Sequence, residues 1–259
     1  MAKTMAPAIP PAAAPLNVGR DHSRQAERLF YVLAAGAVAS VSAVGFRSFY
    51  LQGKGFGGNP LTEQIVPLIL VHALAMSCWI ILFCVQSALI LAGNRRLHMV
   101  LGPIGAGLAV AIVFLGSAMA ILSAHFNPRA YEMFGGPRFF LVEMLTEILL
   151  FGVLVGIAIA QRRRAEIHRP MMLLATVVIL SGALARCPIV CDLAATPPLY
   201  AYAPVLIFGA LLFFMQWVMT RRANRWYLLG YSAVTVTFLL SMPLGRSSLW
   251  KQIVGRFIS

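Results

Sequence analysis

The sequence contains few charged residues, and very few of them are acidic. Only 8 of its 259 residues are Asp or Glu, against 21 Lys and Arg, and charged residues make up 11% of the chain. Because about a quarter of the residues in a soluble domain are charged, this composition disfavours a soluble globular protein. The formal net charge of +13 would suggest nucleic-acid binding in a soluble protein. Here the basic residues separate apolar runs instead of forming one patch, so we expect no nucleic-acid partner.

Motifs of the common enzyme classes are also absent. The chain has no P-loop, no Rossmann glycine pattern, no H-E-x-x-H pair and no recognisable Ser–His–Asp arrangement. Hydrolase and nucleotide-driven activities therefore have no support, and whether the chain is an enzyme stays open. The four cysteines follow no zinc spacing. Cys187 and Cys191 are either two packing thiols or a local disulfide.

What the sequence does have is a series of long apolar runs. A bilayer span needs about 20 predominantly apolar residues, and no segment alternates with period two as a β-barrel strand would. We therefore predict an all-α, polytopic transmembrane helical bundle of about seven spans over residues 29–245, with the lipid bilayer as its surroundings. Residues 1–28 are expected to form a disordered cytoplasmic tail, and 246–259 a short interfacial segment. The runs are Leu29–Phe46, Ile65–Ala92, Met99–Ala124, Phe139–Ala160, Pro170–Cys191, Ala203–Met219 and Trp226–Leu244.

Basic residues are unevenly divided between the two sets of segments that connect these runs. The N-terminal tail and three short loops carry thirteen Lys and Arg, and the alternate segments carry eight. The positive-inside rule then places the N-terminus in the cytoplasm and the C-terminus outside. The basic loops are also candidate contacts for anionic lipid headgroups. The thirteen are Lys3, Arg20, Arg24, Arg28, Arg95, Arg96, Arg162, Arg163, Arg164, Arg169, Arg221, Arg222 and Arg225.

Four ionisable residues lie inside the apolar runs, where an unpaired charge costs several kcal/mol. Helical rise places His72, Glu143, Glu147 and Arg186 in one layer of the outer half of the bilayer. Glu143 and Glu147 are four residues apart and share a helix face. One interpretation is a structural ion pair between Arg186 and either glutamate. The other is a functional site, in which His72, Glu143 and Glu147 bind a metal ion or relay protons.

A polar stripe marks the second run. His72, Trp79 and Gln86 recur every seven residues and therefore lie on one side of a helix. This stripe is either a packing face or the lining of a cofactor or substrate cavity. Two tyrosines further along the chain, Tyr202 and Tyr227, lie near run ends and are expected to be interfacial anchors.

Two further histidines lie at the cytoplasmic start of the third and fifth apolar runs. His98 and His168 each follow a group of arginines, which suits contact with phosphate or lipid headgroups. Alternatively, they are axial ligands of one haem. With His72 they form the set of candidate cofactor-binding residues, and haem b or a transition metal are the cofactors considered.

Several of these segments resemble an uncharacterised family of bacterial seven-helix membrane proteins. The family shows a tyrosine-containing motif after the first span, a His…Trp…Gln helix and two loops that combine His with Arg or Lys. The resemblance covers about residues 44–190, but Met99 and Pro170 depart from the family's loop motifs. It implies a multi-pass protein of the bacterial inner membrane and supports the choice of His72, His98, His168 and Arg186, without supplying a reaction. The matching stretches are 45–50, 72–86, 93–102 and 162–188.

Together these patterns leave two functions open. The first is a metal- or haem-associated redox membrane protein with a polar intramembrane site. The alternative is a non-catalytic, transporter-like or accessory membrane protein, whose buried charges serve packing or proton coupling. The substrate, the protein partners and the oligomeric state are not indicated by the sequence.

Overall fold

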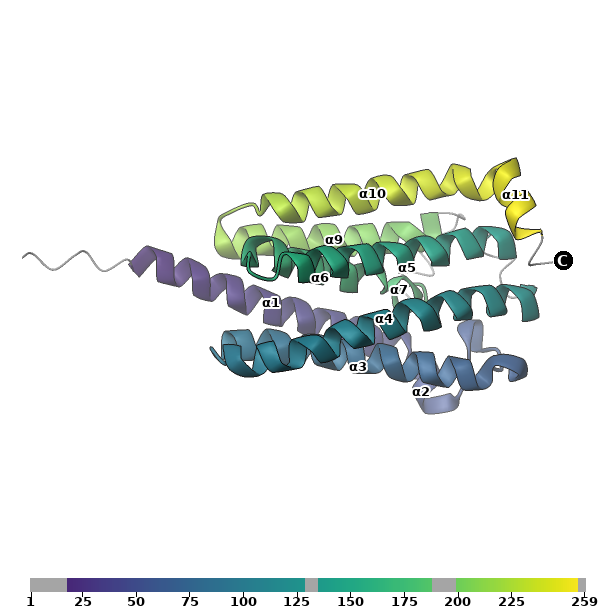
Figure 1. Cartoon of the computed structure of the whole chain (residues 1–259), viewed down its shortest axis with the longest axis horizontal. Coiled ribbons are helices and arrows are strands. Elements are labelled where there is room, and N and C mark those ends of the chain that lie inside the picture. The colour runs from purple at the N-terminus through teal and green to yellow at the C-terminus, as the bar shows by residue number, and fades with distance from the viewer. Residues whose placement is uncertain (1–17, 129–134, 188–198, 256–259) are drawn as a thin grey trace, which may run out of the picture.

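The computed structural model describes residues 18–128, 135–187 and 199–255, and these segments are helical with short connections (Figure 1). Within these described segments, six helices are long and apolar enough to cross a membrane. The helical bundle predicted from composition is therefore confirmed at this level, and the six helices suggest a multi-pass membrane protein. The candidate spans are Ser23–Gly45, Glu63–Leu91, Arg95–Phe126, Pro137–Ala160, Tyr202–Thr220 and Arg225–Arg246.

The first helix begins earlier than the sequence suggested. Helix α1 covers Val18–Gly45, so residues 18–28, which were assigned to a disordered tail, are helical. Residues 1–17 lie outside the described segments. A short helix, α2 (Arg47–Gln52), and two 3₁₀ turns, Phe56–Gly58 and Glu63–Ile65, connect α1 to α3.

Helices α3 (Val66–Leu91) and α4 (Arg95–Phe126) form a hairpin with a tight turn. Gly93 adopts a positive φ of 76° in this turn, a conformation that favours glycine. The Asn94 side chain then accepts a hydrogen bond from the Leu97 backbone N–H and caps the start of α4. Helix α5 (Pro137–Ala160) begins with proline, whose missing N–H costs nothing at that position.

The C-terminal part contains α9 (Leu199–Thr220), α10 (Arg225–Arg246) and α11 (Ser248–Val254). Asn224 caps α10 by accepting from the backbone N–H groups of Trp226 and Tyr227. Helix α11, which falls in the predicted interfacial segment, packs on the start of α5. The Trp250 Nε1 donates to the Arg138 carbonyl over 2.8 Å, and this contact fixes α11 against the bundle.

The fifth apolar run does not form one long helix. Helix α6 (Ala165–Val178) ends inside the bundle, the chain turns at residues 179 and 180, and α7 covers only Ser181–Leu184. For this reason the described part of the chain contains six candidate spans where seven were expected. Backbone bonds partly repair the break, because the Leu180 N–H donates to the Val177 carbonyl and the Ala185 N–H donates to that of Ser181.

Helix α6 lies at the centre of the bundle, in contact with α1, α5, α9 and α10. Leu173, Ala175 and Val178 are fully buried there. The long helices around it expose large apolar side chains, as expected for surfaces that face lipid. These exposed residues include Leu74, Ile81, Phe114, Leu149, Leu211 and Leu240.

The two ends of the bundle differ in their connections. One end carries the start of α1 and the α3–α4, α5–α6 and α9–α10 loops, and we call it the basic end because of the arginines in these segments (Figure 1, left). The opposite end carries α2 and α11.

Candidate functional site

Two carboxyl groups are buried together on α5. The Glu143 side chain is 1% exposed and that of Glu147 is 4% exposed. Their spacing of four residues places both on the face of α5 that points into the bundle. The sequence expectation that these residues avoid lipid therefore agrees with their burial.

Hydroxyl groups from three other helices lie around this pair. The Ser181 Oγ, at the start of α7, donates a hydrogen bond to the Glu147 Oε2. On the α9–α10 side, the Tyr202 hydroxyl lies 2.7 Å from the Ser241 Oγ, and the Tyr202 ring stacks on Phe238. Tyr202 also lies within electrostatic range of both glutamates. We call these five residues (Glu143, Glu147, Ser181, Tyr202 and Ser241) the acidic cluster.

The acidic cluster leaves carboxylate oxygens without partners. The Oε1 atoms of Glu143 and Glu147 are buried and accept no hydrogen bond in the structure. Within the described segments, ion pairs join Arg164 to Glu166 and Arg169 to Glu27, and none reaches the acidic cluster.

The predicted ion pair between Arg186 and a glutamate is not formed among the described residues. The Arg186 Nη1 instead donates to the Gly182 carbonyl over 2.6 Å. Its guanidinium also lies over the rings of Phe46 and Phe56, 4.8 and 4.9 Å from their centroids. The physical reason is that Arg186 follows the break after α6, so its guanidinium lies beside Phe46, directly after α1.

His72 does not join the glutamates either. The His72 side chain points from α3 toward Gly116 of α4, where Ile148 of α5 also packs. A Cβ added to Gly116 would lie 3.5 Å from the His72 Cε1 and 3.1 Å from the Ile148 Cδ1. Successive helix residues point about 100° apart, which sends Ile148 and Glu147 in different directions. No group of three His, Cys, Asp or Glu side chains that could hold a metal ion occurs in the described part of the chain. The structure therefore does not assemble His72, Glu143 and Glu147 into the predicted metal site.

The polar stripe on α3 faces protein along its length. Trp79 is buried, its Nε1 donates to the Thr176 Oγ1 over 3.2 Å, and its ring meets Phe151 edge to face. The Gln86 Nε2 donates to the backbone carbonyl of His98 over 3.3 Å. These contacts join α3 to α4, α5 and α6.

At the basic end, His98 and His168 come together from α4 and α6. Their ring centroids are 6.3 Å apart and the rings are nearly perpendicular, at 88°. The His168 Nδ1 lies 2.8 Å from the Ala158 carbonyl oxygen, and donation from Nδ1 leaves Nε2 with its lone pair. The His98 Nδ1 is buried without a partner. Of the three candidate cofactor residues, the structure therefore brings two side by side and leaves His72 apart.

Three members of the acidic cluster, Ser181, Tyr202 and Ser241, were not predicted from the sequence as site residues. Ser181 and Ser241 give no signal by themselves, because single hydroxyls are common in membrane helices. Tyr202, predicted to be an interfacial anchor, is 1% exposed and hydrogen-bonded inside the bundle. Tyr227 is likewise buried, with its hydroxyl donating to the Gly209 carbonyl. The Ser181–Gly182 pair within an apolar run was the one available signal, because both residues are poorer helix formers than Ala or Leu.

The Cys187 and Cys191 alternatives cannot be compared, because Cys191 falls outside the described residues. Comparison of the chain with protein-family models, with curated proteins and with solved structures finds no match. The resemblance drawn from the sequence motifs therefore stays a prediction.

Proposed function

We propose that this chain is a multi-pass protein of the bacterial inner membrane that binds protons at Glu143 and Glu147. In this proposal it couples their protonation to a rearrangement of the α6–α7 segment, as a proton-coupled, transporter-like protein does. The basic end faces the cytoplasm. One observation carries the proposal: two carboxyl groups are buried side by side, and one oxygen of each has no partner.

Charge balance favours protons as the bound species. Two uncompensated carboxylates inside a bundle would each cost several kcal/mol. The Ser181 hydroxyl that bonds Glu147 is neutral, and no arginine, lysine or histidine nitrogen of the described residues lies within 4 Å of either glutamate. Uptake of a proton removes one charge and supplies an O–H donor. The Tyr202–Ser241 pair adds hydroxyls that both donate and accept, as a proton pathway requires.

The break between α6 and α7 supports coupling to movement. Irregular backbone at membrane depth occurs where it is enclosed by protein or lines a cavity, and discontinuous helices form the binding sites of many transporters. Ser181, the first residue of α7, holds the Glu147 carboxyl group. A change in the charge of Glu147 therefore acts directly on the break between α6 and α7.

Infrared titration of the purified protein in liposomes tests this proposal. We expect a carbonyl stretch from buried, protonated carboxylic acid, which moves to lower frequency in D₂O. Glu143→Gln and Glu147→Gln should each remove part of this band and slow proton uptake into the liposomes under an imposed membrane potential. Ser181→Ala should keep the band and shift its frequency, because the hydrogen bond to Glu147 is lost.

The matched control is Glu63→Gln, which changes an exposed glutamate at the opposite end of the bundle. It should leave both the band and the proton uptake unchanged. A band that survives both Glu143→Gln and Glu147→Gln at full intensity would contradict the proposal.

A second candidate function is electron transfer, and the His98–His168 pair favours it. Two histidines from different helices with adjacent rings, one oriented by a backbone carbonyl, are the arrangement used for axial ligation of a b-type haem. His98 and His168 would hold such a haem, which supplies one-electron chemistry when bound. The Ala158 carbonyl would fix the orientation of the His168 ring.

A further inference from the structure

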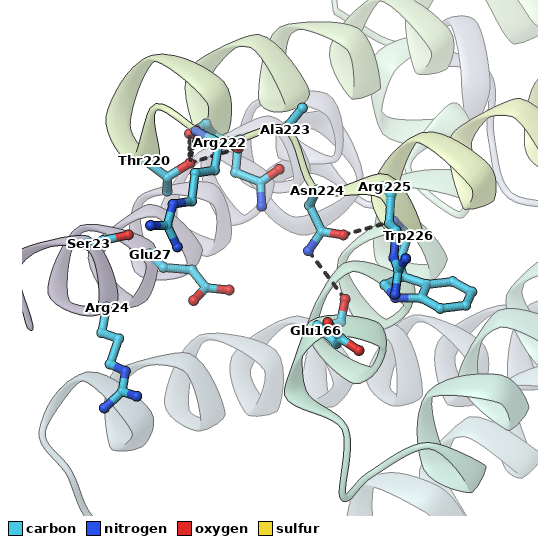
Figure 2. A pocket seen from close by; sticks show the side chains of 11 residues that line it. Ser23, Arg24, Glu27, Glu166, Thr220, Arg222, Ala223, Asn224, Arg225 and Trp226 are labelled. Atoms are coloured by element: carbon cyan, nitrogen blue, oxygen red, sulfur yellow. Dashed lines mark hydrogen bonds between the residues drawn. The ribbon is translucent and has the colours of Figure 1, made fainter. Parts of the chain in front are cut away.

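A cavity of about 630 Å³ opens at the basic end of the bundle (Figure 2). It lies between the start of α1, the start of α6, the end of α9 and the start of α10. The Asn224 Nδ2 donates to the Glu166 carbonyl over 3.2 Å and so ties the α9–α10 loop to α6. The cavity is thus held by contacts between segments far apart in the sequence, and its volume lies in the range of small-molecule sites.

The charges on the cavity wall are not balanced. Three arginines line it, Arg24, Arg222 and Arg225, against two glutamates. Both glutamates are already paired: Glu27 with Arg169 and Glu166 with Arg164, each over 3.2 Å, and neither of those two arginines lines the cavity. In the described part of the chain, no carboxylate lies within 4 Å of the three lining guanidinium groups. The wall therefore presents cationic groups to whatever enters it.

Two buried polar groups of the lining also lack partners. Gln216 is 2% exposed and lines the cavity, and its Oε1 accepts no hydrogen bond. The Trp226 Nε1 is buried without an acceptor, and the guanidiniums of Arg164 and Arg225 lie over the Trp226 ring. A buried N–H without an acceptor and a buried carboxamide oxygen without a donor are costly unless a ligand satisfies them.

A second cavity of about 340 Å³ adjoins the first. The two share Arg24 and Glu27, and the second adds Arg28, Arg95 and Arg169. The basic lining therefore continues from the gap between α1 and α10 to the gap between α1 and α4.

We propose that the first cavity binds the phosphate group of a ligand, either the headgroup of an anionic lipid or a soluble phosphorylated molecule. Guanidinium groups match the geometry of phosphate oxygens, and three of them line this cavity with no carboxylate of the described residues within 4 Å. Trp226 supplies a neutral donor, and the Gln216 carboxamide donates to phosphate or accepts from a neighbouring hydroxyl. This inference does not depend on proton binding by the acidic cluster, which lies deeper in the bundle.

Binding measurements on the full-length protein in nanodiscs test the proposal. In discs of phosphatidylcholine, titration with inorganic phosphate and with glycerol 3-phosphate measures the affinity for soluble ligands. In discs with added phosphatidylglycerol, native mass spectrometry counts retained anionic lipids. Loss of one charge-assisted hydrogen bond should weaken binding by about tenfold or more, so we expect this effect from Arg222→Gln and Arg225→Gln. Gln216→Leu should weaken binding without changing the charge of the wall.

The control is Arg96→Gln, which removes an exposed arginine of the basic end that lines neither cavity. Binding of soluble phosphate that depends on Arg222 and Gln216 assigns the site to a soluble ligand. Retention of phosphatidylglycerol alone, with the same dependence, assigns it to a lipid headgroup. The proposal is overturned if neither ligand binds, or if Arg96→Gln weakens binding as much as Arg222→Gln does.

Discussion

The second candidate function, electron transfer through a haem, depends on two histidines, His98 and His168. Protein purified from cells supplied with iron should show a haem absorption band if His98 and His168 are axial ligands. His98→Ala and His168→Ala should each abolish the band, because no third His, Cys, Asp or Glu side chain joins this pair among the described residues. His125→Ala, at the far end of α4, is the matched control and should keep it. A spectrum without the band, together with a metal analysis that finds no bound transition metal, would exclude this function.

The sequence was sufficient to recognise the ionisable residues that lie inside the apolar runs. It was not sufficient to predict which residues they contact. A glutamate in an apolar run must avoid lipid, so the burial of Glu143 and Glu147 follows from composition. The direction in which His72 points depends on how α3 is rotated relative to α5. That rotation cannot be derived from the spacing of residues within a single apolar run. For the same reason, the contact of Arg186 with Phe46 and Phe56 had no signal in the sequence.

At the scale of elements, the contact between α1 and α7 depends on one glycine. A Cβ on Gly45 would lie 2.3 Å from the Ala183 carbonyl oxygen, which is backbone and cannot rotate away. Gly45→Ala should therefore destabilise the protein by about 1–3 kcal/mol, the usual cost of overpacking a core. Thermal unfolding in detergent, followed by circular dichroism, measures the change.

Gly36→Ala provides the comparison on the same helix. A Cβ at Gly36 would meet nothing within 4 Å, so alanine there should stabilise α1 by about 0.5–1 kcal/mol through helix propensity alone. Equal effects of the two substitutions would mean that α1 and α7 do not approach as closely as the structure has them.

Most helix positions were predictable, and the exception is informative. Length and hydropathy placed the runs that became α1, α3, α4, α5, α9 and α10. The start of α1 was missed because its first turns, before the apolar run, are polar. These polar residues continue the helix without an apolar stripe that the sequence pattern could reveal. The break after α6 was missed because Ile179 and Leu180, where the chain turns, are as apolar as the residues of a continuous span, and the Ser181–Gly182 pair that follows is only a weak signal. Burial on all sides compensates for its irregular backbone, and that compensation is visible only in three dimensions.

At the scale of the whole molecule, the distribution of basic residues predicts which end faces the cytoplasm. The structure places the starts of α1, α4, α6 and α10 at one end, and these segments and the loops before them carry twelve of the thirteen basic residues counted for the cytoplasmic side. The thirteenth, Lys3, lies outside the described residues. The positive-inside rule therefore predicts the basic end in the cytoplasm. Both proposals depend on this orientation, since it fixes the compartment that supplies the phosphate-bearing ligand and the side from which protons reach Glu147.

Cysteine labelling measures this orientation. In a variant whose four native cysteines are replaced by serine, Arg163→Cys marks the basic end and Lys54→Cys marks the opposite end, and both positions are exposed. In bacterial spheroplasts, a membrane-impermeant maleimide should label Lys54→Cys directly and Arg163→Cys only after the membrane is opened. The reverse pattern would place the phosphate cavity outside the cell, where a soluble phosphorylated ligand would come from the medium. Labelling of both positions in sealed spheroplasts would mean that the two ends lie on one side, and the six-span arrangement itself would then be wrong.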